Sequence, residues 1–282
     1  MSFVTLPILR RASGPASRLQ PASPDALARS AAGDPLHRSY AFTPDRFFSN
    51  DWISWRARSV SGLHGAVPEH WNDLRLSGVL LRGGFMRAIA TRWLFDLPAG
   101  LQGSVGVRAT PGGHESANTL PRAYAARRVE VVPDEVTMLK AVADPRFDAT
   151  AVAYALDTHA AGEFPGSKAT MIEWRRDEPD RQSLQVTATD RCFVVIADAW
   201  APGWSARVDG RPARLILVDA ALRGVSLPAG SHSLDLAYVP PGWGTGRLLA
   251  GLGWLAWIGA GLLALLRASP LGSRRIIMSA GA

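Results

Sequence analysis

The longest apolar run of the chain lies near its C-terminal end and restricts the fold more than any other feature. Residues 248–266 read LLAGLGWLAWIGAGLLALL, without a single charged side chain. As an α-helix this segment would be about 28 Å long at roughly 1.5 Å per residue, close to the roughly 30 Å of a bilayer core. A helix in the core of a soluble protein usually keeps a polar face. We therefore expect a transmembrane helix over residues 246–267, with a buried core helix as the alternative.

The positive charge of the chain lies at its two ends. The net charge is +7; residues 1–30 contribute +3 and residues 247–282 contribute +4, so the body between them is neutral. A nucleic-acid-binding domain usually carries basic residues on a folded face, whereas basic ends beside an apolar segment are typical of a membrane surface. We therefore expect the lipid bilayer as a partner, and no nucleic acid.

Arginines after the apolar run indicate the orientation of the expected span. Arg267, Arg274 and Arg275 follow it, and positive residues beside a span favour the cytoplasmic side. We expect a single-pass membrane protein whose basic tail, residues 268–282, is cytoplasmic and whose large domain lies outside the cytoplasm.

The N-terminal sequence does not provide the export signal that this orientation requires. In MSFVTLPILRRASGPAS the apolar run is short, contains Pro7, and is followed rather than preceded by arginines. Three explanations remain open. The chain is the C-terminal part of a longer multi-spanning protein, or an upstream start precedes Met1, or the charge rule is overridden.

The region before residue 183 contains both helix and strand signals. Residues 1–35 are rich in Pro, Ala and Ser and predict a disordered linker. Residues 36–182 predict a mixed α/β extracytoplasmic region. Within it, the apolar spacing of residues 134–144 favours a helix behind two acidic residues, and residues 129–133 and 151–156 favour strands.

Short apolar segments alternate with turn sequences over residues 183–242. The stretch WSARV-DG-RPARLILV, residues 204–218, predicts a hairpin, because Asp-Gly suits the positive φ values of a type I′ turn. Several short strands at this spacing predict an antiparallel β-sandwich-like part. The expected fold class is α+β, mainly β, with a few short helices and one C-terminal transmembrane helix.

Several sequence blocks carry a family resemblance. They are PGWSARVDG at residues 202–210, RGVSLPAGSH at 223–232, YVP at 238–240 and, less specifically, NTLPRAY at 118–124. Together they resemble the C-terminal extracytoplasmic module and last transmembrane helix of the YfhO-like bacterial membrane proteins. The resemblance covers roughly residues 36–266.

The resemblance implies both a function and a missing part. Members of that family are similar to GT-C type lipid-linked glycosyltransferases, and many transmembrane helices precede this module in them. Their catalytic acidic residues lie between the first helices, which this sequence lacks. The implied role is an accessory, non-catalytic domain at the bacterial inner membrane, beside a multi-spanning protein encoded upstream, with a glycan or a lipid-linked sugar as a possible ligand.

Four side chains are candidates for contact with a glycan or a partner. Trp200 and Trp204 flank a Pro-Gly turn, and aromatic faces beside turns stack on sugars, although packing at a sheet edge explains them as well. Arg122 could bind a phosphate or carboxylate of a ligand, or it could form a structural ion pair with a buried acidic side chain. His114 precedes Glu115 in a Gly-rich segment. The two side chains could act as a general acid–base pair, or they could belong to a solvated loop without a chemical role.

The sequence predicts no catalytic, cofactor-binding or metal-binding residue. Cys192 is the single cysteine, and neither a CxxC nor an HExxH pattern occurs. Two alternatives to the accessory domain stay open. One is a membrane-anchored module that binds carbohydrate or cell wall, and the other is a cytoplasmic enzyme with a hydrophobic tail.

Overall fold

The computed structural model describes residues 26–47, 51–60, 69–101 and 106–268. The chain forms two units, Met1–Ala237 and Tyr238–Ala282. The first unit is mixed α+β and mainly β. Its longer helices are α1 (Ala26–Ala32), α4 (Glu69–Leu76), α5 (Gly83–Ala88) and α6 (Glu135–Ala143), and its shorter ones include α2 (Pro44–Phe47) and α3 (Asp51–Ser54).

A small sheet forms the N-terminal part of the first unit. Its strands are β1 (Arg38–Ala41), β2 (Thr91–Phe95), β4 (Gly113–Ser116) and β3 (Val107–Thr110), in that order. β1 runs parallel to β2, and the other pairs are antiparallel. The apolar face of α1 packs with Trp52, Trp93 and Phe95 in a small core of its own.

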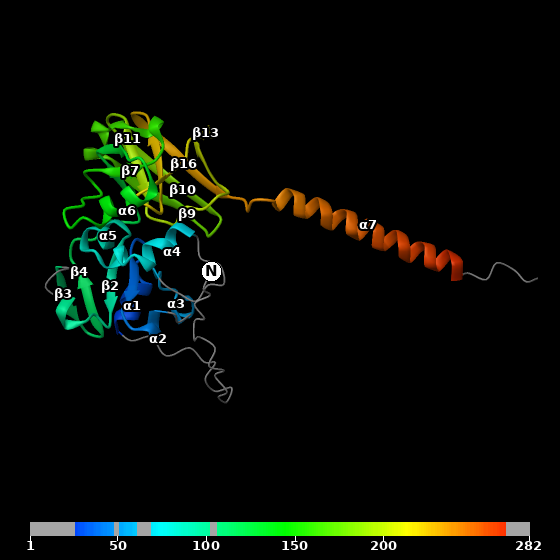
Figure 1. Cartoon of the computed structure of the whole chain (residues 1–282), viewed down its shortest axis with the longest axis horizontal. Coiled ribbons are helices and arrows are strands. Elements are labelled where there is room, and N and C mark those ends of the chain that lie inside the picture. The colour runs from blue at the N-terminus through cyan, green and yellow to red at the C-terminus, as the bar shows by residue number, and fades with distance from the viewer. Residues whose placement is uncertain (1–25, 48–50, 61–68, 102–105, 269–282) are drawn as a thin grey trace, which may run out of the picture. The chain divides into compact units, whose positions relative to one another are not determined.

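Two larger sheets form the rest of this unit (Figure 1). The seven-stranded sheet has the order β5 (Ala123–Ala126), β11 (Cys192–Ile196), β15 (Leu222–Leu227), β14 (Ile216–Val218), β7 (Ala153–Ala155), β6 (Arg128–Val131), β8 (Gly162–Glu163). The five-stranded sheet has the order β13 (Arg211–Ala213), β12 (Trp204–Val208), β16 (Gly230–Tyr238), β10 (Arg181–Ala188), β9 (Met171–Asp177).

The two larger sheets pack face to face, as a β-sandwich does. Leu184 and Val186 alternate along β10, and they share one apolar cluster with Val194 of β11, Val225 of β15 and Leu234 of β16. This period of two places one face of each strand in the interior. The predicted sandwich-like part is therefore confirmed.

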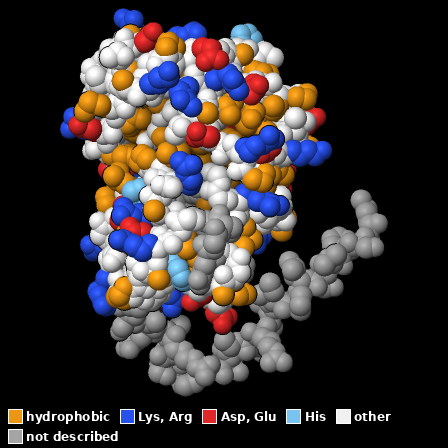
Figure 2. Space-filling view, turned by 90° about the vertical axis from the view of Figure 1, so that its left-hand side faces the viewer, with side chains coloured by type: hydrophobic (Ala, Val, Ile, Leu, Met, Phe, Trp, Pro, Cys, Tyr) orange, Lys and Arg blue, Asp and Glu red, His pale blue; other side chains and the backbone are white. Residues whose placement is uncertain are grey.

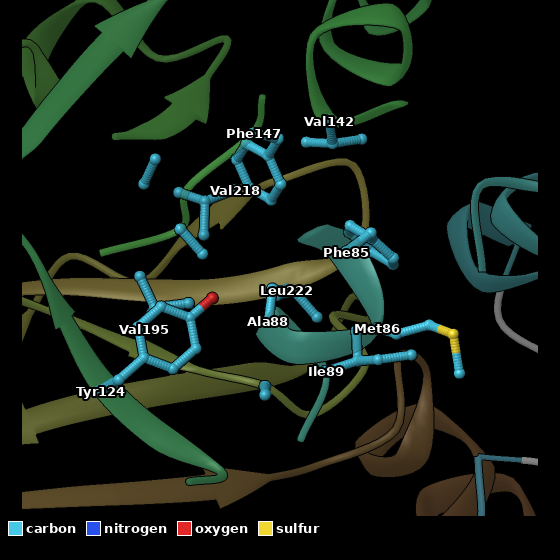
Figure 3. Close-up of a cluster of buried hydrophobic side chains, with 14 of the residues drawn as sticks. Phe85, Met86, Ala88, Ile89, Tyr124, Val142, Phe147, Val195, Val218 and Leu222 are labelled. Atoms are coloured by element: carbon cyan, nitrogen blue, oxygen red, sulfur yellow. The ribbon is translucent and has the colours of Figure 1, made fainter. Parts of the chain in front are cut away.

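Helices cover the opposite face of the seven-stranded sheet. Figure 3 shows Phe85 of α5 and Ile89, the residue after this helix, near Val195, Val218 and Leu222 of three neighbouring strands, and all belong to one buried cluster. The same cluster includes Leu94 of β2 and Val142 of α6. The small sheet and the sandwich thus share a continuous core.

Local predictions within the first unit agree with the structure. The helix expected over residues 134–144 is α6, and its N-cap Asp134 accepts a hydrogen bond from the Thr137 amide at 2.7 Å. The strands expected over residues 129–133 and 151–156 are β6 and β7.

The hairpin prediction is confirmed only for its first part. Asp209 and Gly210 have φ values of 51° and 76° and connect β12 to β13, with Val208 opposite Arg211. The expected second strand, residues 211–218, is divided between the two sheets. β13 pairs with β12, whereas Ile216 and Val218 of β14 enter the core of the seven-stranded sheet.

Two expected boundaries differ from the structure. Residues 26–32 of the expected linker, 1–35, form α1, because Leu27, Ala28 and Ala31 have an apolar core to pack against. Residues 1–25 lie outside the described part. Strands from both sides of the expected boundary at 182/183 share the seven-stranded sheet, where β5 pairs with β11.

Charged and apolar side chains alternate over the surface. Figure 2 shows basic and acidic side chains close to one another, with apolar ones between them, over one face. Elsewhere on the described surface, charged residues form exposed local pairs, such as Arg175 with Glu173 at 2.9 Å and Arg146 with Asp144 at 3.1 Å. Exposed pairs of this kind contribute little to stability.

The second unit contains helix α7, Trp243–Ala268. It includes the predicted span, residues 246–267, and is long and apolar enough to cross a membrane. Its side chains from Trp243 to Arg267 are all exposed in the structure. None of these side chains is buried among the residues that the structure describes.

Candidate functional site: an arginine-lined cleft

Three arginines with little solvent exposure lie close together inside the first unit. Arg122 and Arg223 are each 2% exposed and Arg38 is 9% exposed. Charged side chains are almost never buried to this extent unless they are paired. Their partners are Asp177 and Asp198, and we refer to these five residues together with Arg58 as the arginine cluster.

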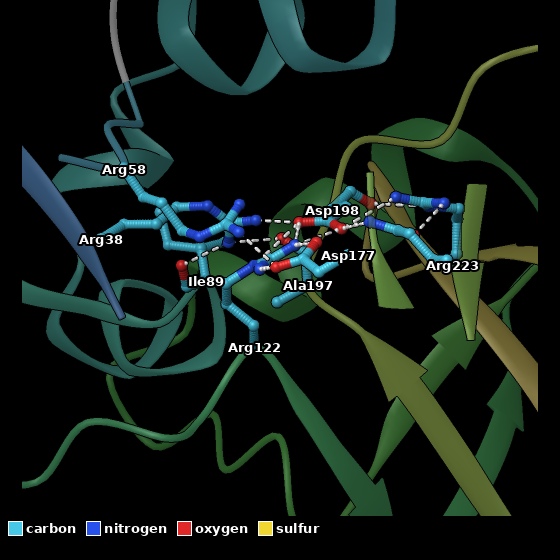
Figure 4. Close-up of polar contacts among 9 residues, drawn as sticks. Arg38, Arg58, Ile89, Arg122, Asp177, Ala197, Asp198 and Arg223 are labelled. Carbon is cyan, nitrogen blue, oxygen red and sulfur yellow. Dashed lines mark hydrogen bonds and ion pairs between the residues drawn. The ribbon is translucent and has the colours of Figure 1, made fainter. Parts of the chain in front are cut away.

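The cluster joins all three sheets. Arg38 is the first residue of β1, and Asp177 is the last residue of β9. Arg122 directly precedes β5, and Asp198 lies two residues after β11. With Arg223 of β15, these positions cover the small sheet and both sheets of the sandwich. The two carboxylates lie between the arginines, as Figure 4 shows.

Asp198 is the acceptor shared by most of the cluster. Its carboxylate accepts from Arg122 Nη2 at 2.9 Å and from Gln182 Nε2 at 2.6 Å. Arg223 Nη2 lies 3.1 Å from Asp198 Oδ2, and Arg38 Nη2 also donates to this carboxylate. One carboxylate therefore faces three guanidinium groups and an amide.

Asp177 is the second acceptor. Arg122 donates to both of its oxygens, from Nη1 at 2.6 Å and from Nη2 at 3.2 Å, and Arg58 Nη2 donates as well. The remaining donors of the buried arginines reach neutral acceptors. Arg38 Nη1 binds the carbonyl oxygens of Ile89 and Ala197 at 2.9 and 2.6 Å.

Two tryptophans cover the buried guanidinium groups. The Arg122 guanidinium lies 4.6 Å from the ring centroid of Trp174, and that of Arg223 lies 4.0 Å from the ring centroid of Trp204. Both distances fit cation–π contacts, which are stronger when the cation is shielded from water. The aromatic rings thus hold the arginines in place and limit their hydration.

The charges of the cluster alter the acidity of its members. Burial alone would raise the pKa of Asp198, but Arg38, Arg122 and Arg223 bring it far below its usual range. Burial lowers the pKa of Arg38 and of Arg223 to about 10, and repulsion from Arg122 adds to this effect against the attraction of Asp198. Arg38, Asp198 and Arg223 therefore stay charged at neutral pH.

An open cleft of about 750 Å³ lies against the cluster. Arg122 and Arg223 line it, while Arg56 and Arg58 lie nearer to solvent and Trp204 forms part of the wall. The acidic side chains that line it are Asp34, Asp177, Glu178 and Asp198. Its size lies within the usual range for small-molecule sites, about 300–1,000 Å³.

The structure separates the two candidate tryptophans. Trp204 lines the cleft and contacts Arg223, whereas the ring of Trp200 meets His70 edge-on at a centroid distance of 5.4 Å and does not line the cleft. They do not form one flat platform. A sugar contact at either residue stays a prediction, which a glycan array tests through loss of binding in Trp200→Ala or Trp204→Ala.

The other two candidates lie in different places. Arg122 occupies the centre of the cluster, where its nitrogens bind Asp177 and Asp198, so the structural role considered from the sequence accounts for it. His114 lies on strand β4, not in a loop and not at the cleft. The neighbouring Glu115 binds Arg92 and Arg108 instead of His114.

Most of the arginine cluster was not predicted from the sequence. Arg38, Arg58, Asp177, Asp198 and Arg223 are far apart in the chain, and only the fold brings them together. One local signal was present, because Asp198 directly follows six apolar residues, CFVVIA. A carboxylate at the end of such a buried strand requires a buried cation or donors.

The described residues contain no group of three or more His, Cys, Asp or Glu side chains placed to hold a metal ion. Comparison of the chain with models of known protein families, with curated proteins and with solved structures finds no match. The resemblance to the YfhO-like family stays a prediction from the sequence motifs.

Proposed function

We propose that this chain is a membrane-anchored, extracytoplasmic accessory domain of a YfhO-like, GT-C type glycosyltransferase system, and that it is itself non-catalytic. The observation that carries the anchoring is the change from a folded β-rich unit to an exposed apolar helix within a few residues. β16 ends at Tyr238, and α7 begins at Trp243.

The exposed surface of α7 favours lipid over water. Monomeric soluble proteins rarely expose continuous apolar patches larger than a few hundred Å². Leu255 is 67% exposed and Trp257 is 71% exposed, and large apolar residues continue on all sides of the helix. In a bilayer the same helix satisfies its own backbone hydrogen bonds and needs no polar face.

The proposed orientation places the folded unit outside the cytoplasm. It relies on Arg267, Arg274 and Arg275 after the apolar run, since positive residues are retained on the cytoplasmic side. The proposed partner, a multi-spanning protein, would hold the first unit at the outer surface and contribute the catalytic groups.

Protease treatment of spheroplasts tests the orientation. We expect an external protease to cleave the first unit of the full chain while a cytoplasmic marker protein stays intact. A first unit that is cut only after the cells are lysed would place it in the cytoplasm and contradict the proposal.

A transfer assay tests the non-catalytic role. Purified full chain, incubated with a polyprenyl-phosphate sugar and an acceptor, is expected to give no product. Turnover by this chain alone would contradict an accessory role, and the arginine cluster would then be the first place to test by substitution.

A further inference from the structure

We propose that the cleft beside the arginine cluster binds a doubly charged oxyanion of the phosphate type, through Arg56 and Arg58, with Arg122 and Arg223 behind them. The chemical class is a phosphate monoester or inorganic phosphate. This inference does not depend on the membrane attachment or on the glycosyltransferase system, so either proposal can fail without the other.

The charge of the cluster is the first argument. In the part of the chain that the structure describes, Arg38, Arg58, Arg122 and Arg223 form ion pairs with Asp177 and Asp198 alone, which leaves two positive charges in excess. Charge that is shielded from water and not neutralised is costly. A single dianion in the cleft would neutralise the excess.

The other acids at the cleft do not remove this excess. Asp34 accepts from Trp93 Nε1 at 3.2 Å and pairs with His37 at 2.9 Å and Arg92 at 3.4 Å. Glu178 lies 3.6 Å from Arg176. Each of these carboxylates thus already has a cation outside the cluster.

The second argument is which donors remain for a ligand. The nitrogens of Arg122 are taken by the two aspartates, so Arg122 contributes charge and not new hydrogen bonds. Arg58 binds Asp177 through Nη2 alone, and its side chain is 36% exposed. Arg56 is exposed at the cleft, and its guanidinium has no hydrogen-bond or ion-pair partner among the described residues.

The third argument is the geometry of Arg56 and Arg58 at the edge of the cleft, which fits an oxyanion with several terminal oxygens. The guanidinium fork donates two parallel hydrogen bonds to phosphate or carboxylate, and two arginines close in sequence present two such forks. The backbone at Arg56 is fixed in the left-handed region, with φ of 57°, by hydrogen bonds from its amide to Ile53 and from Ala57 to Trp52. The cleft volume leaves room for a group attached to the phosphate.

Titration calorimetry on the full chain in an uncharged detergent tests this proposal. The probes are inorganic phosphate and water-soluble dihexanoyl phosphatidic acid. We expect binding of at least one probe, weakened about tenfold or more in the double variant Arg56→Gln/Arg58→Gln, which corresponds to about 1.4 kcal/mol or more. Arg146→Gln changes an arginine whose side chain is 90% exposed and whose ion-pair partner among the described residues is Asp144; it is the matched control and should bind like the unaltered chain.

The two probes separate the sources of the anion. If phosphatidic acid binds more tightly and inorganic phosphate competes with it, the proposal is supported and the ligand is a lipid headgroup. Preference for inorganic phosphate supports it with a soluble ligand. Absence of binding for both probes overturns it.

Single variants keep the test independent of folding. Arg56→Gln removes no side-chain hydrogen bond or ion pair among the described residues and should keep the thermal unfolding temperature, while the affinity falls several-fold. Affinity that is the same in Arg56→Gln, in the double variant and in the control overturns the proposal, because binding would then occur elsewhere.

Discussion

At the scale of single residues, Asp198 has the largest expected effect on stability. The Asp198 carboxylate is the common counter-charge of three buried guanidinium groups, those of Arg38, Arg122 and Arg223. Breaking a buried ion pair by removing one partner costs about 3–5 kcal/mol. We expect Asp198→Asn to lower the free energy of unfolding by roughly this amount in denaturant titrations followed by circular dichroism.

The control for this variant is Asp144→Asn. Asp144 pairs with Arg146 on the surface, so its loss should change the free energy of unfolding by less than about 0.5 kcal/mol. Equal effects of the two substitutions would contradict the structural role of the cluster.

Asp219 should make stability depend on pH in the direction opposite to that of most carboxylates. Burial raises its pKa to about 7, against the lowering effect of the hydrogen bond from the Tyr154 amide. The unfolded chain releases this proton near pH 4, so the free energy of unfolding falls as the pH rises from about 4 to about 7.

The variant Asp219→Asn isolates this effect. Asn tolerates the φ value of 50° at this position and keeps the oxygen that accepts from Tyr154. We expect it to be more stable than the unaltered chain at pH 8 by roughly 1–3 kcal/mol, with no such gain at pH 4. The measurement is the denaturation midpoint at both pH values, and a gain that is equal at both would contradict the assignment.

At the scale of elements, the Asp-Gly turn is attached to a neighbouring strand of the same sheet. His232 of β16 bonds through Nδ1 to Asp209 at 2.6 Å, and its Nε2 lies 3.0 Å from the Ala229 carbonyl. The carbonyl and the carboxylate both raise the pKa of His232. The turn is thus fixed to β16 by a contact that the local sequence does not reveal.

This contact should contribute most at acidic pH. Because the folded-state pKa of His232 is raised, its contribution is complete below the unfolded value of about 6.5 and is lost as the pH rises through the folded value. We expect NMR titration to give a pKa above 6.5 for His232 in the full chain and a lower one in Asp209→Asn. An unchanged value in the variant would contradict the contact.

Helices and turns could be predicted from the sequence where neighbouring residues alone determine the backbone conformation. The acidic start of α6 and the Asp-Gly turn specify backbone geometry within a few residues, and both are present. The pairing of β5 with β11 was not predictable, because almost seventy residues separate them. The cluster around Asp198 depends on that pairing and on β1, so its composition follows from the tertiary fold.

At the scale of the whole molecule, α7 differs from helices α5 and α6 of the first unit. α5 and α6 bury apolar side chains in the core beside the seven-stranded sheet, whereas the side chains of α7 from Trp243 to Arg267 are exposed. The sequence predicted this helix almost to its ends, because an uninterrupted apolar run needs no tertiary partner to be recognised.

Extraction of bacterial membranes with alkaline carbonate tests the proposed membrane anchor most directly. We expect the full chain to stay in the membrane pellet. A variant with Leu255→Arg and Ile258→Arg should move to the supernatant, since an arginine at the centre of a span costs about 2.5–3.5 kcal/mol. Release of the unaltered chain by carbonate, or retention of both proteins, would contradict anchoring by α7.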